Sequence, residues 1–161
     1  MEAVTILIGL AGAAVAVAAR PVWGLVAYLV ILYLWPDYVR VSLGGASTSA
    51  ARLVITALVL RCLADPRLRG RFRWILLDKL VLLVMTVFAG TLLLTTPLSD
   101  WFINRVGFLM DTLLVYGAVR LIVTSPVQLR TVVRALAILT VPLAIGGIVE
   151  TFTARSLYSG L

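Results

Sequence analysis

The chain has 161 residues, of which 62% are hydrophobic and 13% charged, with a net charge of +7 and a mean hydropathy of +1.11. Soluble domains are roughly 45–50% apolar and about 25% charged, so this composition argues against a soluble domain and against a disordered chain. The single cysteine, Cys62, excludes an internal disulfide, and the absence of histidine excludes histidine-based catalysis and histidine-ligated metals. At about 20 residues a span, the length predicts a single all-α domain, a polytopic transmembrane helical bundle of about six spans.

The first two apolar runs, residues 4–19 and 22–35, predict a helical hairpin that turns at Arg20-Pro21. Residues 1–19 could instead be a cleaved signal peptide, because Ala16-Val17-Ala18 is similar to a cleavage site. The segment before the run carries Glu2 and no positive charge, unlike a typical signal peptide, so a retained helix is favoured. Small residues spaced four apart within it permit close contact with neighbouring helices: Gly9, Gly12, Ala13 and Ala16.

A polar segment, residues 36–51, separates the hairpin from the rest of the chain. Its Ser47-Thr48-Ser49 run is typical of a loop that leads into an N-capped helix. Four further spans are predicted over residues 50–63, 76–96, 106–124 and 133–149. The last of them contains Pro142 and Gly146-Gly147, which predict a kinked or broken helix.

The positive charge indicates membrane orientation rather than binding to nucleic acid. Basic residues gather in the loop 64–75 and in the connectors after the first and fifth spans. In a six-span alternation these connectors share one side, and loops rich in Arg and Lys are normally cytoplasmic. We therefore expect a multi-pass membrane protein whose basic loops lie at the cytoplasmic face and contact lipid headgroups. The residues are Arg20, Arg67, Arg69, Arg71, Arg73, Lys79, Arg130 and Arg134.

Ionisable residues inside a span need a reason, because a charge at the bilayer centre costs about 2.5–3.5 kcal/mol. Arg61 and Arg120 lie near the cytoplasmic ends of their spans, so we expect them to extend to the interface. Asp111 lies about 7–8 Å into its span and must be protonated or paired within the bundle. Arg52, in the outer part of the third span, is its candidate partner. The pair would be a structural clamp or a substrate contact.

Three further arginines lie in predicted outer segments: Arg40, Arg105 and Arg155. Guanidinium groups bind phosphate oxygens bidentately, so these residues, with Arg52, are candidate ligands for a pyrophosphate. Simple anchoring at the interface is the alternative. The sequence has no Gly-rich phosphate loop after a strand and no zinc-ligand spacing, so we expect no metal and no cofactor, and no catalytic residue is assigned.

Five short segments carry a resemblance to a known family: Arg20-Pro21-Val22-Trp23-Gly24, Leu34-Trp35-Pro36, Asp78-Lys79, residues 120–130 and residues 147–158. In this order they resemble the N-terminal half of the O-antigen ligase and polymerase superfamily of bacterial envelope proteins. The last segment resembles the family's exit onto the outer face, with Glu150, Arg155 and Tyr158 at the start of the external region.

The resemblance implies transfer of a glycan from an undecaprenyl-pyrophosphate carrier to an acceptor at the outer face of the inner membrane. The family's chemistry is credited to arginine and histidine residues in a large external loop and later helices. This chain has no histidine and stops where that loop would begin. The resemblance therefore implies that the catalytic half lies in a missing C-terminal part or in a partner subunit.

Two other functions fit the same sequence. A small transporter or channel subunit would use the sixth helix and Asp111 to line a pathway. A structural membrane protein would assemble with partners through its small-residue helix faces and would catalyse nothing.

Overall fold

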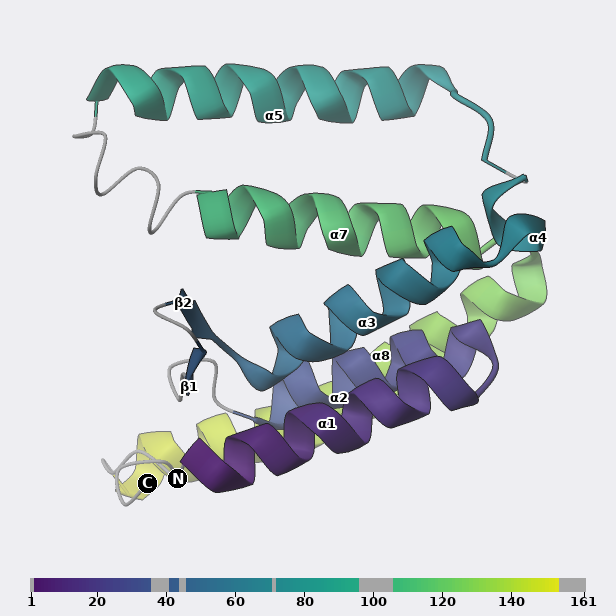
Figure 1. Ribbon diagram of the computed structural model, residues 1–161. Coiled ribbons are helices and arrows are strands. Elements are labelled where there is room, and N and C mark those ends of the chain that lie inside the picture. The colour runs from purple at the N-terminus through teal and green to yellow at the C-terminus, as the bar shows by residue number, and fades with distance from the viewer. Residues whose placement is uncertain (1, 36–40, 44–45, 71, 96–105, 154–161) are drawn as a thin grey trace.

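The computed structural model describes residues 2–35, 41–43, 46–70, 72–95 and 106–153 (Figure 1). Within these ranges the chain is all-helical apart from one short antiparallel hairpin, in which Val41 lies opposite Thr48. The elements in chain order are α1 (Glu2–Ala18), α2 (Pro21–Leu34), β1 (Val41–Leu43), β2 (Ala46–Thr48), α3 (Ala50–Ala64), α4 (Pro66–Arg69), α5 (Leu76–Thr95), α7 (Val106–Ile122) and α8 (Pro126–Thr153). The predicted all-α class is confirmed for the described residues.

The long helices extend along roughly one direction, so that the molecule has two distinct ends (Figure 1). The α1–α2 turn, α4 and the connection from α7 to α8 lie at one end, which we call the α4 end. The β1–β2 hairpin lies at the other, the hairpin end. Helix α3 contacts α1, α2 and α7, while α8 packs on α2. Helix α5 lies beside α7, apart from the other helices (Figure 1).

The centre of the core is α3. Its residues Val54, Ile55 and Leu58 have at most 1% of their surface exposed, and they cluster with Leu25 of α2 and Ala16 of α1. These side chains come from three helices that contact one another pairwise. The first three long helices therefore form the packed unit on which α7 and α8 lie.

Small residues allow this close packing, as their spacing predicts. Gly9, Gly12 and Ala16 all lie on the buried side of α1. In α2, a Cβ atom added at Gly24 would lie 3.0 Å from the Cα atom of Ala16 and 2.8 Å from Cδ1 of Leu58. A larger residue at this position would therefore push the backbones of α1 and α2 apart.

The observed helices begin and end within two residues of five predicted spans: α1, α2, α3, α5 and α7. The proline and arginine residues between the apolar runs are sufficient to predict where these helices begin and end. The Ser49 hydroxyl accepts a hydrogen bond from the backbone N–H of Arg52 at 3.4 Å, which confirms the predicted N-capped start of α3. The β1–β2 hairpin in the predicted polar loop and the short helix α4 in the basic loop were not predicted.

Helix α8 differs from the sixth predicted span at its start. Helix α8 begins at Pro126 and not near residue 133, because Ser125 and Gln128 form a capping box. The Ser125 hydroxyl accepts a hydrogen bond from the backbone N–H of Gln128 at 3.3 Å. The Oε1 atom of Gln128 in turn accepts a hydrogen bond from the backbone N–H of Ser125 at 3.0 Å. The helix continues through Pro142 without a break, so of the two predicted outcomes the break is wrong and the kink stays a prediction.

One helical stretch in the described part of the chain is long and apolar enough to cross a membrane, residues Pro126–Val149 of α8. Helices α1 and α2 are also apolar but have only 17 and 14 residues. Among the described residues, one helix is therefore long and apolar enough to span a membrane, whereas the sequence predicted about six such helices. The difference arises because several predicted spans are shorter than the roughly 20 residues that cross a hydrocarbon core without tilt or thinning.

The α1–α2 contact provides a test of the packing. Replacing Gly24 by Leu should lower the free energy of unfolding by about 1–3 kcal/mol, because the backbone of Ala16 cannot move aside. Replacing Gly117 of α7 by Leu is the matched control, since nothing lies within 4 Å of a Cβ added there. Thermal unfolding of the purified variants measures both effects. Equal stability of the two variants would contradict the packing described here.

Candidate functional site

An ion pair joins α3 to α7 toward the hairpin end of the bundle. Arg52 lies in the first turn of α3, and Asp111 lies in the second turn of α7. The Arg52 Nε atom donates to Oδ1 of Asp111 at 2.9 Å, and its Nη2 atom donates to Oδ2 at 2.5 Å. The pair proposed from the sequence is therefore present, with the two-pronged geometry that makes guanidinium–carboxylate contacts specific.

The surroundings of this pair leave room for a ligand or for water. About a third of each side chain is exposed, 34% for Arg52 and 36% for Asp111. A cavity of about 530 Å³ lies along α7, lined by Asp111, Tyr116 and the buried Tyr28 of α2. A smaller cavity of about 80 Å³ is lined by both members of the pair and again by Tyr28. The pair therefore lies where two cavities adjoin.

Gly107 explains how the guanidinium fits against α7. A Cβ atom at this position would lie 3.2 Å from Nη2 of Arg52, tighter than ordinary van der Waals contact. Glycine is therefore the residue that lets the Arg52 side chain lie against the first turn of α7 while it reaches Asp111. The contact between Gly107 and Arg52 was not predicted, because the local sequence pattern does not indicate which helix lies beside Gly107.

A second cluster of charged residues, not predicted, links α5 to α7 near the α4 end. The Asp78 side chain is only 2% exposed, and its Oδ1 atom accepts from the Tyr116 hydroxyl at 2.5 Å and from Arg120 Nε at 3.1 Å. Its Oδ2 atom accepts from the backbone N–H of Ile75 at 2.8 Å, which caps the start of α5. The sequence feature that could have indicated this cluster is the four-residue spacing of Tyr116 and Arg120, which places both side chains on one face of α7.

The two arginines expected to extend to the interface have specific partners within the protein. Arg120 bonds to Asp78 and to the backbone carbonyl of Arg73, the latter at 3.2 Å. Arg61 donates to the carbonyl of Ala16 at 2.7 Å and to that of Ala19. Carbonyl groups at the end of a helix have no partner within it, so the Arg61 guanidinium satisfies the last turn of α1. Whether these two side chains also reach the membrane interface stays a prediction.

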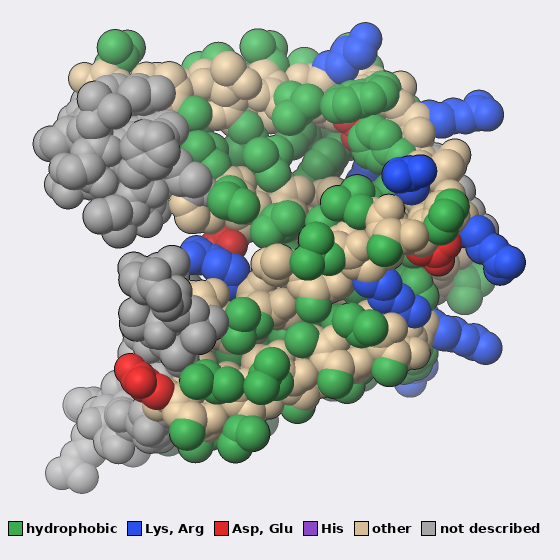
Figure 2. Space-filling view, viewed as in Figure 1, with side chains coloured by type: hydrophobic (Ala, Val, Ile, Leu, Met, Phe, Trp, Pro, Cys, Tyr) green, Lys and Arg blue, Asp and Glu red, His purple; other side chains and the backbone are tan. Residues whose placement is uncertain are grey.

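Basic side chains gather at the α4 end, as Figure 2 shows, over the helix ends and connectors at that side of the molecule. The described residues there include Arg67, Arg69 and Arg73 around α4, and Lys79 at the start of α5. Asp65 caps α4 by accepting from the backbone N–H of Arg67 at 2.9 Å. Apart from the exposed arginines, the surface along the helices is largely hydrophobic in this view (Figure 2).

Most of the other predicted site residues lie outside the described residues: Arg40, Arg105, Arg155 and Tyr158. Glu150 belongs to the last turns of α8, but its side chain lies outside the described part. Whether the three outer arginines converge therefore stays a prediction. Among the residues that the structure does describe, no group of three or more acidic or cysteine side chains could hold a metal ion.

Comparisons with protein-family models, with curated proteins and with solved structures found no match to this chain. The resemblance to the O-antigen ligase and polymerase superfamily thus stays a hypothesis.

The Arg52–Asp111 pair can be tested by reversing its charges. Arg52→Asp or Asp111→Arg alone should lower the free energy of unfolding by about 1–3 kcal/mol, since each places two like charges together. The double variant should recover at least half of that loss, as measured by thermal unfolding. A double variant as unstable as the sum of the two single variants would show that the contact contributes nothing.

The Asp78 cluster should matter more for stability because the carboxylate is buried. Asp78→Ala should clearly lower the free energy of unfolding, measured by thermal unfolding, because it leaves Arg120 and Tyr116 without their shared acceptor. The exposed neighbour Lys79→Ala is the control and should change stability by less than about 0.5 kcal/mol. Similar losses for the two variants would rule out the role assigned to Asp78.

Proposed function

We propose that this chain is a multi-pass protein of the bacterial inner membrane, with the α4 end in the cytoplasm. The support is the exposed apolar surface of helices from every part of the chain. Only 11% of the membrane-length stretch of α8 is buried, and large hydrophobic side chains are exposed on other helices as well. Examples are Leu7 of α1, Leu83, Val84 and Val87 of α5, and Ile138, Ile145 and Phe152 of α8. Water-soluble monomers rarely expose apolar patches on this scale.

The orientation follows from the separation of charge. The arginines and lysine of the α4 end lie on the side where the positive-inside rule places the cytoplasm. The same side carries Asp78 and Arg120, which neutralise each other where α5 begins and α7 ends. The arrangement leaves the hairpin end, with the Arg52–Asp111 pair, toward the outer leaflet.

Site-directed labelling tests the membrane topology. In a Cys62→Ala background, Arg69→Cys at the α4 end should react with a membrane-impermeant maleimide only after the cells are permeabilised. Ala3→Cys, near the start of α1 at the opposite end, is the matched probe and should react in intact cells. Labelling of the Arg69 position from outside, or recovery of the protein in the detergent-free soluble fraction, would overturn the proposal.

We further propose that the chain is the membrane-embedded N-terminal part of an O-antigen ligase- or polymerase-like protein. Such a protein handles a glycan linked to undecaprenyl pyrophosphate at the outer face. The observation that supports this function is an open, largely apolar cavity of about 530 Å³ along α7, next to the contact that joins α3 to α7. An open space with apolar walls suits the hydrocarbon chain of such a ligand.

The pairing with Asp111 defines the part that Arg52 plays in this proposal. Its positive charge is already balanced by a carboxylate, so it holds α3 and α7 at a fixed separation beside the cavity. The pyrophosphate oxygens would then be bound chiefly by Arg40, Arg105 and Arg155. In sequence, Arg105 directly precedes α7 and Arg155 follows the end of α8 by two residues. Glycosyl transfer itself would need the C-terminal half or a partner subunit.

One observation favours the alternative of a transporter subunit. Asp111 lines both cavities, as a carboxylate on an ion or proton pathway would. Flux in reconstituted vesicles that Asp111→Asn abolishes would support this function and would contradict the glycan proposal.

The glycan proposal can be tested with the complete protein in its source bacterium. Deletion of the gene should cause lipid-linked glycan to accumulate, measured by mass spectrometry of extracted undecaprenyl-pyrophosphate species. A triple Arg40, Arg105 and Arg155→Ala variant should fail to reverse the accumulation, although it is present in the membrane at normal abundance. Arg130→Ala at the α4 end is the matched control and should restore the wild-type pool. An unchanged pool after deletion would exclude this function.

A further inference from the structure

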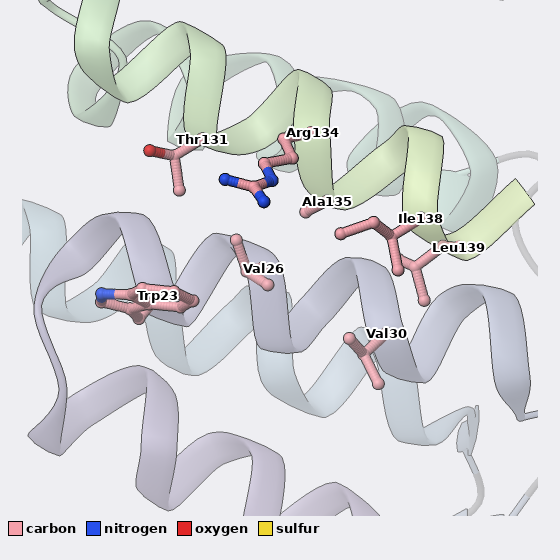
Figure 3. Close-up of a pocket in the computed structure, with 8 residues that line it drawn as sticks. All are labelled: Trp23, Val26, Val30, Thr131, Arg134, Ala135, Ile138 and Leu139. Carbon is pink, nitrogen blue, oxygen red and sulfur yellow. The ribbon is translucent and has the colours of Figure 1, made fainter.

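A groove between α2 and α8 forms a feature separate from the Arg52–Asp111 site. Its larger part has a volume of about 520 Å³ and is lined by Trp23, Val26 and Val30 of α2 and by residues of α8. Figure 3 shows these two sets of side chains facing each other, with the Arg134 guanidinium on the α8 side. The residues contributed by α8 are Thr131, Arg134, Ala135, Ile138 and Leu139.

A second cavity of about 340 Å³ extends the groove toward the α4 end. It shares Trp23 and Thr131 with the first and adds Arg20 and Gln128 to the lining. The polarity of the groove lining therefore changes along its length. Arginine and amide side chains line it near the α1–α2 turn, and only aliphatic side chains line its far part, around Val30 and Leu139.

The groove lies parallel to the helices. Trp23, Val26 and Val30 follow one another at three- and four-residue spacing on α2, which places them on one face. The distance along α2 from Arg20 to Val30 is about 15 Å at the helical rise. Such a length suits a single extended hydrocarbon chain, with a charged group at the Arg20 end.

We propose that this groove binds an acidic phospholipid of the cytoplasmic leaflet. The phosphate would lie between Arg20 and Arg134, and one acyl chain would extend along Val26, Val30 and Ile138. Charge complementarity selects the acidic headgroup, because two guanidinium groups line the groove where the cytoplasmic headgroup layer is proposed to lie. The indole of Trp23, 55% exposed, is placed where membrane proteins put tryptophan, between headgroups and chains.

This inference rests on the proposed membrane topology but not on the glycan function. It concerns arginines near the α4 end, none of which takes part in the proposed binding of pyrophosphate. It would therefore survive a failure of the lipid-linked glycan experiment.

Quenching of Trp23 fluorescence by brominated lipids tests the site in the full chain. The other tryptophans are replaced by Phe at positions 35, 74 and 101, and the protein is reconstituted in vesicles. One set of vesicles contains brominated phosphatidylglycerol and unbrominated phosphatidylcholine. In the other set only the phosphatidylcholine is brominated. We expect phosphatidylglycerol to be preferred about fivefold or more at Trp23, since the two guanidinium groups that line the groove would contact the anionic headgroup directly.

The arginines of the groove should carry this preference. Arg134→Ala should reduce it at least threefold, while Arg134→Lys should keep most of it, because lysine also binds phosphate as a point charge. Arg130→Ala is the control: it removes an exposed arginine from the same helix and should leave the preference unchanged.

Three results would overturn the inference. Equal quenching by both lipids would mean unselective surrounding lipid. Absence of quenching by either lipid would mean that a second copy or another protein segment covers the groove. Failure of the protein to float with the vesicles would reject the membrane proposal and this one together, whereas flotation without lipid preference would reject only this one.

Discussion

The close approach of α1, α2 and α3 is the constraint on which the rest of the structure depends. Gly24 and Ala16 bring the backbones of α1 and α2 to van der Waals distance, and Leu58 of α3 fills the space beside them. Side chains of this size leave almost no volume between the helices, so many dispersion contacts form across the interface. Helices α7 and α8 then pack on a surface that these three helices define.

Two charged contacts complete the arrangement at opposite ends. Arg52 and Asp111 join α3 to α7 toward the hairpin end, and Asp78 joins α5 to α7 near the α4 end. Because an unpaired charge in an apolar environment is expensive, each contact favours one register of its two helices over alternatives. Directional polar contacts thus supply the specificity that apolar helix surfaces lack.

Helix boundaries could be predicted because proline and arginine interrupt apolar runs. The Arg52–Asp111 pair could be predicted because the two opposite charges lie inside predicted spans, near the same end of the bundle. Asp78 was missed because a carboxylate at a helix start is usually explained by capping, a role it also has. The Ser125–Gln128 spacing is typical of a helix start and could have indicated where α8 begins. The sixth span was instead predicted from its apolar run, which begins later. The roles of Gly107 and Arg61 depend on which helices are neighbours, and periodicity carries no information about that. Convergence of the outer arginines requires the arrangement of segments outside the described residues.

Helix α5 is held differently from the other long helices. Among the described residues, it reaches α7 through the Asp78 cluster near its beginning and through the Phe88–Phe108 ring contact, 5.8 Å between centroids, further along. These described contacts are fewer than those among α1, α2 and α3, so α5 is attached less firmly than the helices of the core. The tilt of α5 relative to α7 can therefore change without disturbing the packing of the first three long helices.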